Sequence, residues 1–387
     1  MSLYHDVLSI INEYINSIKI LKQIDNNKVN NDNNNVIPLN VFGVPWRADD
    51  IMQHRLIELK KVTVLLSESC TKLAILIVKK LSNEVIDSIV IEIKKYIELL
   101  YVGFIELQQC LLCDPLFHLI KQETLCILVQ IKDFIDYIIV NNYDNSVNIL
   151  AGMISERSDS MQKVPMSNKA AYRRSILECI SVTKDTVQEF ETYIQESNDN
   201  DNNGNDNDNN GNDDNDDNDE MDFDDDDVNY SSTEIITVSK CLSLIKSSLE
   251  CMKVALAVMT CVGDNVTNSK LQRGTTTTTN TTTNTGDIVV NDLDKPLLEM
   301  QCDEWIVKVH RSCKLLDSSV LSLGGELYPP VTVEDIDDLY IELSTTLQST
   351  IDLLQSQQYQ SMLSMEVSNT LQNFINVISS LPKSLKT

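Results

Sequence analysis

Proline and glycine are scarce in this sequence, with 8 and 10 occurrences among 387 residues. Both residue types mark turns, so their scarcity disfavours a fold assembled from many short strands. Aromatic residues make up only 5% of the chain, while leucine and isoleucine are abundant, as in helical bundles. The composition therefore predicts long helices, in a chain large enough to bury one or two sizeable cores.

Basic residues are also few: 31 Lys and Arg stand against 58 Asp and Glu, giving a net charge of −27. Residues 197–230 contain 14 Asp, one Glu and no Lys or Arg, so −15 of this charge lies there and −12 elsewhere. The phosphates of nucleic acids and of anionic lipids attract Lys and Arg. We therefore expect no direct binding to nucleic acid or to membranes.

The N-terminal residues lack a basic start followed by an apolar run, so we expect no signal peptide. No charge-free stretch is long enough for a transmembrane helix, which needs about 18 or more apolar residues. Ten cysteines without a secretory signal indicate reduced, mostly buried thiols. We expect a protein of the cytoplasm and nucleus.

Apolar residues recur with helical spacing along most of the chain. This predicts an all-α fold of about ten long helices in one or two bundles, at residues 2–24, 49–81, 83–113, 117–141, 147–161, 167–196, 231–263, 288–323, 332–354 and 362–381. Asn-, Asp- and Thr-rich inserts at 25–45, 197–230 and 264–286 are predicted to be disordered, because they bury too little apolar surface to order themselves. We expect an N-terminal bundle (1–196), an acidic linker (197–230) and a C-terminal bundle (231–387).

The two predicted helices that flank the acidic linker carry regular apolar stripes. Alternating spacings of three and four connect Ile176 to Ile194 in the first helix and Val238 to Met259 in the second, which opens with a capping box at Ser231–Glu234. Such a stripe needs a partner face. It forms either the core of the bundle or a dimerisation surface of the helix–loop–helix or zipper kind. Because no basic region precedes either helix, a helix–loop–helix partner would give a heterodimer that does not bind DNA.

A locally basic patch, made of Arg157, Lys163, Lys169, Arg173 and Arg174, precedes the acidic linker. We hypothesise that the linker folds over this patch and screens it from partners; the alternative is a solvating linker. Asp213–Asp227 lacks the spaced ligands and glycine of a calcium loop. The candidate partner-binding residues are Lys169, Arg173, Arg174, Val238, Leu242, Ile245, Leu249 and Met252.

Motifs for catalysis and for cofactor binding are missing. The sequence contains no phosphate-binding loop, dinucleotide fingerprint or nucleophile elbow. Cys110 and Cys113 form a C-x-x-C motif near His118, but a zinc site needs a second close pair, so we interpret both as buried helical cysteines. The adjacent Asp337 and Asp338 are interpreted as a solvated helix face. We expect no enzymatic activity, no cofactor and no metal.

Four short motifs occur in a distinctive order: V-P-M-S-N-K-A-A at 164–171, V-T-K-D at 182–185, C-L at 241–242 and Y-P-P at 328–330. In their order and spacing, from about residue 49 onward, the chain resembles the cyclin-D-binding protein family, also called GCIP. The resemblance implies an all-helical, non-enzymatic regulator that binds D-type cyclins, reduces phosphorylation of the retinoblastoma protein and restrains the cell cycle. It also implies helix–loop–helix transcription factors as a further class of partner. The alternative is a cytoskeletal adaptor built from vinculin- or catenin-like bundles.

Overall fold

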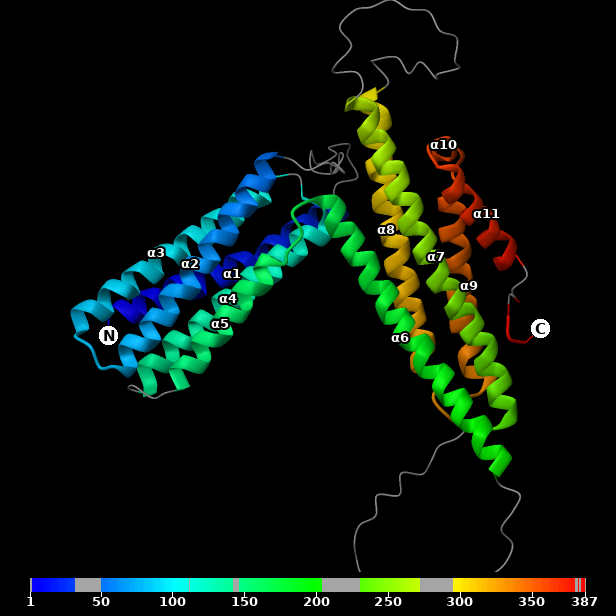
Figure 1. The fold of residues 1–387 in the computed structure, drawn as a ribbon, viewed down its shortest axis with the longest axis horizontal. Helices are drawn as coiled ribbons and strands as arrows, with labels where there is room; N and C mark the ends of the chain where they lie inside the picture. The colour runs from blue at the N-terminus through cyan, green and yellow to red at the C-terminus, as the bar shows by residue number, and fades with distance from the viewer. Residues whose placement is uncertain are drawn as a thin grey trace, which may run out of the picture. The chain divides into compact units, whose positions relative to one another are not determined.

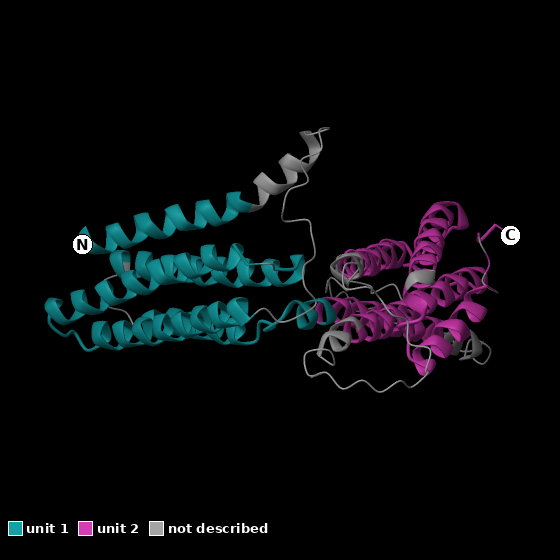
Figure 2. Cartoon of the chain, turned by 90° about the horizontal axis from the view of Figure 1, so that it is seen from above, with its two compact units in different colours: residues 1–173 teal, residues 174–387 magenta. Residues whose placement is uncertain are grey.

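The structure, a computed structural model, describes residues 2–31, 50–110, 112–141, 146–203, 230–271, 295–379, 382 and 384–386. Within these ranges the chain forms eleven helices, one of them a single turn, and no strand. The predicted all-α fold is therefore confirmed. The chain divides into two compact units, residues 1–173 and 174–387, which Figure 2 colours separately.

Unit 1 is a bundle of five helices (Figure 1): α1 (Ser2–Asn31), α2 (Asp50–Val78), α3 (Asn83–Gln108), α4 (Asp114–Asn141) and α5 (Ser146–Gln162). Helix α1 packs on α3 and α4, α2 packs on α3 and α5, and α4 packs on α5. Each helix turns one apolar face inward. On α3, for example, the buried positions from Ile86 to Leu107 are three or four residues apart, the spacing that places side chains on one side of a helix.

Two buried polar side chains hold the segment that follows α5 within unit 1. The Lys60 ammonium donates hydrogen bonds to the carbonyl oxygens of Gln162 at 2.9 Å and Val164 at 2.6 Å. The side-chain oxygen of Asn168, which is fully buried, accepts a 2.8 Å hydrogen bond from the Cys113 N–H. The chain therefore leaves unit 1 through a segment tied to both α2 and the α3–α4 connection.

Unit 2 contains α6 (Asn168–Asn203) from Arg174 onward, α7 (Ser232–Leu271), α8 (Lys295–Gly325), α9 (Val333–Leu354), the single turn α10 (Gln357–Gln360) and α11 (Met365–Ile378). Helix α7 packs on α8, α9 and α11, and α8 packs on α9. The predicted capping box at the start of α7 is confirmed, since Ser231 N–H donates to the Glu234 carboxylate at 2.7 Å.

The direction of α6 follows from its contacts. Near its start, Ser175 meets His310 of α8, and further along, Thr186 lies beside Gly324 of the same helix, so α6 and α8 are parallel. Glu191 pairs with Lys246 of α7 at 2.7 Å, and Ser197 accepts a hydrogen bond from the Tyr230 N–H just before α7. Helices α6 and α7 are therefore antiparallel, an orientation that the sequence left open.

Several predicted boundaries are wrong. Helix α1 continues to Asn31 instead of residue 24, α6 to Asn203 instead of 196, and α7 to Leu271 instead of 263. Once a helix has nucleated, each further residue adds a backbone hydrogen bond, so even poor helix formers extend it. Helix α3 ends early, at Gln108, because the chain turns there toward α4.

The boundary between the two units also differs from the expected one at residue 196, since the structure divides the chain after Arg173. The reason is that the apolar side of α6 packs within unit 2, with Ile176, Cys179 and Phe190 buried there. The acidic segment thus connects two neighbouring helices of unit 2. The rest of the predicted disordered inserts, 32–45, 204–229 and 272–286, lies outside the described residues, and so does the Asp213–Asp227 segment.

Candidate partner-binding surface

Five of the eight candidate partner-binding residues lie on α7, and these five are buried. Val238, Leu242, Ile245, Leu249 and Met252 are at most 7% exposed. Residues beside this stripe, such as Cys241, Leu244 and Ser248, are buried as well, as expected for a helix enclosed on several sides. The assignment of these five side chains to a partner surface is therefore wrong: they form the core of unit 2, which was the alternative interpretation of the stripe.

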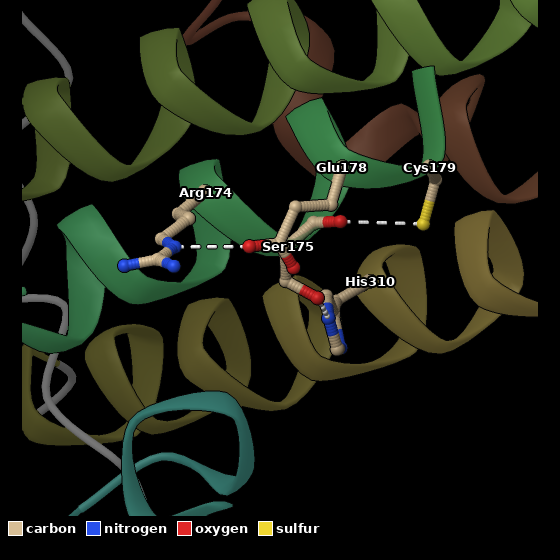
Figure 3. Close-up of polar contacts among 5 residues, drawn as sticks. All are labelled: Arg174, Ser175, Glu178, Cys179 and His310. Carbon is tan, nitrogen blue, oxygen red and sulfur yellow. Dashed lines mark hydrogen bonds and ion pairs between the residues drawn. The ribbon is translucent and has the colours of Figure 1, made fainter. Parts of the chain in front are cut away.

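The other three candidates lie in the first two turns of α6. Lys169 is half-buried, whereas Arg173 and Arg174 are exposed. The Arg174 Nε lies 2.9 Å from a Glu178 carboxylate oxygen one turn later (Figure 3). Both partners are exposed, so this pair contributes only about 0.3–0.5 kcal/mol. The role of these cations in binding, and their screening by the acidic linker, stay predictions.

Beyond Arg174, α6 buries only a narrow seam and leaves the rest of its surface to solvent. On the side away from the core lie Arg174, Leu177, Glu178, Val182 and Asp185, which we call the outer face of α6. Leu177 is 49% exposed and Val182 is 40% exposed. Neither Leu177 nor Val182 was among the eight candidate residues. The sequence nevertheless contains a signal for an exposed apolar surface, because both side chains stand outside the core stripe of their helix.

A polar contact joins α6 to α8 at the start of unit 2 (Figure 3). The Ser175 hydroxyl and the His310 Nε2 are 2.9 Å apart, and the Cys179 thiol donates to the Ser175 carbonyl at 3.2 Å. Burial raises the pKa of the Cys179 thiol to about 11, which disfavours the reactive thiolate. Burial also raises the pKa of the Asp317 carboxyl, which faces the same thiol.

The Ser175–His310 distance matches that of a serine nucleophile and its base. A nucleophile of this kind also needs donors aimed at a developing oxyanion. Ser175 lies inside α6, however, where neighbouring backbone N–H groups bond to carbonyls of the preceding turn. The contact fits a structural tie between α6 and α8. No sequence signal indicates it, because its partners are 135 residues apart.

A cluster of aromatic residues lies where α6 approaches the segment after α8. The rings of Phe190 and Tyr193 on α6 meet the ring of Tyr328, with centroid distances of 5.3 Å from Phe190 and 5.9 Å from Tyr193. The Tyr328 hydroxyl donates a 2.6 Å hydrogen bond to Glu189. Close by, the Tyr230 hydroxyl donates to the Leu327 carbonyl at 2.7 Å. The Y-P-P motif thus begins with a residue that anchors the chain to α6.

Two further predictions need correction. Cys110 and Cys113 lie in the connection between α3 and α4, not in a helix, although Cys113 is buried as expected. Of the adjacent carboxylates, Asp338 is exposed, but Asp337 is only 4% exposed. The Asp337 carboxylate accepts hydrogen bonds from the Leu385 N–H at 2.9 Å and the Ser384 hydroxyl at 3.0 Å. It therefore holds the C-terminal segment against α9.

Among the described residues, no group of three or more His, Cys, Asp or Glu side chains is placed so that it could hold a metal ion. No helix in the described ranges combines the length and the apolar character that crossing a membrane requires. Comparison with models of known protein families finds no match, and comparison with curated proteins finds none either.

Proposed function

We propose that this chain is a non-enzymatic regulator that acts by binding other proteins, with a D-type cyclin as its partner. The observation that carries the proposal is the outer face of α6. It presents Leu177 and Val182, 49% and 40% exposed, between charged side chains on a helix that is fixed to α7 and α8 from behind. The two apolar side chains are five residues apart, so they lie about 140° from each other around the helix and flank the charged centre of this face. A partner groove that covers the whole face therefore meets both of them.

The choice of a D-type cyclin rests on the motifs that resemble the cyclin-D-binding proteins, three of which lie on or beside α6 and α7. In this role the chain occupies a docking surface of the cyclin and its kinase in the nucleus and cytoplasm. Phosphorylation of the retinoblastoma protein then falls, and progress through the cell cycle slows. Arg174 is placed to contribute a charged contact beside Leu177.

The test is a binding assay between the purified full chain and a purified D-type cyclin with its kinase. The double variant Leu177→Asp/Val182→Asp places two carboxylates on the outer face without touching the core. The matched control is Ile149→Asp on α5 of unit 1, where Ile149 is 67% exposed. Circular dichroism of all three proteins checks that they remain folded.

We expect the wild-type chain and the control to bind the cyclin and to lower phosphorylation of the retinoblastoma protein. The double variant should bind at least about tenfold more weakly, since burying two carboxylates without partners opposes association. Absence of wild-type binding contradicts the cyclin assignment. Equal binding by the double variant contradicts the assignment of the outer face.

A further inference from the structure

Two tyrosines at the far end of the α6–α8 contact form an exposed aromatic surface. Tyr193 and Tyr328, which we call the tyrosine pair, are 39% and 44% exposed. Their rings meet edge to face, with an interplanar angle of 80°, and both rest on the buried ring of Phe190. Tyr328 also donates a hydrogen bond to Glu189. The contacts with Phe190 and Glu189 therefore fix the positions of both rings, while the rest of their surface is exposed to solvent.

The charges around the tyrosine pair are negative. The hydrogen bond to Glu189, burial and the Glu189 charge raise the pKa of Tyr328 to about 12. Burial, Tyr193, Tyr328, Glu234 and Glu189 together raise the pKa of the neighbouring Tyr230. The charged groups that raise these two pKa values are the carboxyls of Glu189 and Glu234. The site thus presents aromatic rings and negative charge, and a cation is the chemistry that complements both.

The most acidic part of the sequence starts and ends beside the same cluster. Ser197, one turn after Tyr193, accepts a 3.2 Å hydrogen bond from the N–H of Tyr230. The chain between these two residues carries 14 Asp and one Glu without a Lys or Arg. Whatever its path, a segment of this charge that is anchored at both ends here raises the local concentration of cationic partners.

We propose that the tyrosine pair binds a basic segment of a partner protein, with an arginine side chain lying over the ring of Tyr193 or Tyr328 and beside the Glu189 carboxylate. Cations are attracted to the faces of aromatic rings, and a planar guanidinium also stacks on them and pairs with carboxylates. The buried ring of Phe190 packs against both tyrosine rings and holds them in position. This inference does not rest on the cyclin proposal, which concerns the outer face of α6.

The probe is a fluorescein-labelled nonapeptide of alternating arginine and glycine, titrated with the full chain at 150 mM salt and followed by fluorescence anisotropy. Tyr193→Leu removes one ring and keeps an apolar side chain. Leu315→Ala on α8, where Leu315 is 60% exposed, is the matched control. A nonapeptide with glutamate in place of arginine controls for charge. If Tyr193→Leu does not fold, Glu189→Gln replaces it, since glutamine removes the charge and still accepts the Tyr328 hydrogen bond.

We expect Tyr193→Leu to weaken arginine-peptide binding about 3- to 10-fold, the effect of losing one cation–π contact. Glu189→Gln should weaken it about as much, Leu315→Ala should leave it unchanged, and the glutamate peptide should not bind. Binding that is unchanged in Tyr193→Leu, or in Glu189→Gln where that variant stands in, overturns the site and assigns the attraction to net charge alone. Failure of the wild-type chain to bind the arginine peptide also overturns it. So does self-association that Tyr193→Leu abolishes, because the occupant is then a second copy of this chain.

Discussion

Gly324 lies where α8 comes closest to α6, and substituting it tests whether this approach sets the position of α6. A Cβ atom at Gly324 would lie 3.2 Å from Cγ2 of Thr186 and 3.6 Å from Cε2 of Phe190. Carbon atoms in good contact are about 3.5–4.0 Å apart, so only the first distance is too short. The Thr186 side chain is held by a 3.2 Å hydrogen bond to the Val182 carbonyl and does not turn away freely.

Two effects decide the outcome of Gly324→Ala. Inserting a methyl group into a tight contact costs about 1–3 kcal/mol. Alanine is favoured over glycine inside a helix by about 0.5–1 kcal/mol, which offsets part of that cost. We therefore expect unit 2 to lose about 1 kcal/mol of unfolding free energy. Thr186→Ser removes Cγ2, so the double variant Gly324→Ala/Thr186→Ser should recover most of this loss.

The assay is urea unfolding followed by the fluorescence of Trp305, which is buried in unit 2 and packs against Tyr359 with ring centroids 4.7 Å apart. A Trp46→Phe background removes the other tryptophan. Gly152→Ala on α5 of unit 1 is a control: nothing lies within 4 Å of a Cβ there, so no contact is crowded, and the unfolding curve that Trp305 reports for unit 2 should not shift. If Gly324→Ala is as stable as the wild type, or if Thr186→Ser does not rescue it, the contact does not determine where α6 lies.

Three more predictions concern the core and the two ends of the fold. Leu242→Asp places a carboxylate in the core at a position only 5% exposed, so it should cost more than about 3 kcal/mol and unfold unit 2; unchanged circular dichroism and Trp305 fluorescence would contradict the core assignment. Asn168→Ala leaves the buried Cys113 N–H without its acceptor, so it should lower the unfolding free energy of unit 1 by about 1–3 kcal/mol in urea unfolding. An unshifted unfolding curve would contradict a stabilising role of the Asn168–Cys113 hydrogen bond. Burial raises the pKa of Asp337, but hydrogen bonds from residues 384–386 outweigh it and hold the pKa below its ordinary value. The attachment of residues 384–386 to α9 should therefore persist at neutral pH and weaken as the pH falls through the lowered pKa of Asp337. The measurement is amide exchange of residues 384–386, which should become faster at low pH. Asp337→Asn should remove most of this pH dependence.

The helices of this protein are predictable from sequence because apolar spacing reports one-sided burial. The predicted helix at 332–354 matches α9, Val333–Leu354, to within a residue, since Thr332 precedes it and an apolar stripe runs its length. Ends in polar sequence are not predictable in the same way. The residues after Ile24 and after Glu196 look like loop, yet α1 and α6 continue through them, because backbone hydrogen bonds extend a helix regardless of side-chain chemistry.

Of the sites, those that depend on local apolar spacing are predictable from sequence, and those that depend on long-range contacts are not. Burial of the α7 stripe could be anticipated, because a regular apolar stripe always needs a covering surface. The contacts of Ser175 with His310 and of Tyr193 with Tyr328 could not, since each joins residues more than a hundred positions apart. Tyr328 belongs to the Y-P-P motif, but that motif does not indicate which residue its ring meets. The boundary after Arg173 was missed for a related reason: the long acidic segment suggested a linker between bundles. Loop length adds only slowly to the cost of closing a loop, so such a segment is equally compatible with joining neighbouring helices.

The burial of α7 also limits how this protein can bind a partner. Each of the five stripe residues from Val238 to Met252 contributes about 1.5–3 kcal/mol when buried, so together they supply roughly 8–15 kcal/mol. That is comparable to the entire stability of a domain. A partner that took over the stripe would have to replace nearly all of it, whereas a partner on the outer face of α6 or on the tyrosine pair takes nothing from the core. We therefore expect binding and folding to be separable: changes at the proposed binding residues Leu177, Val182 or Tyr193 should act on association, and changes at Leu242 should act on the fold.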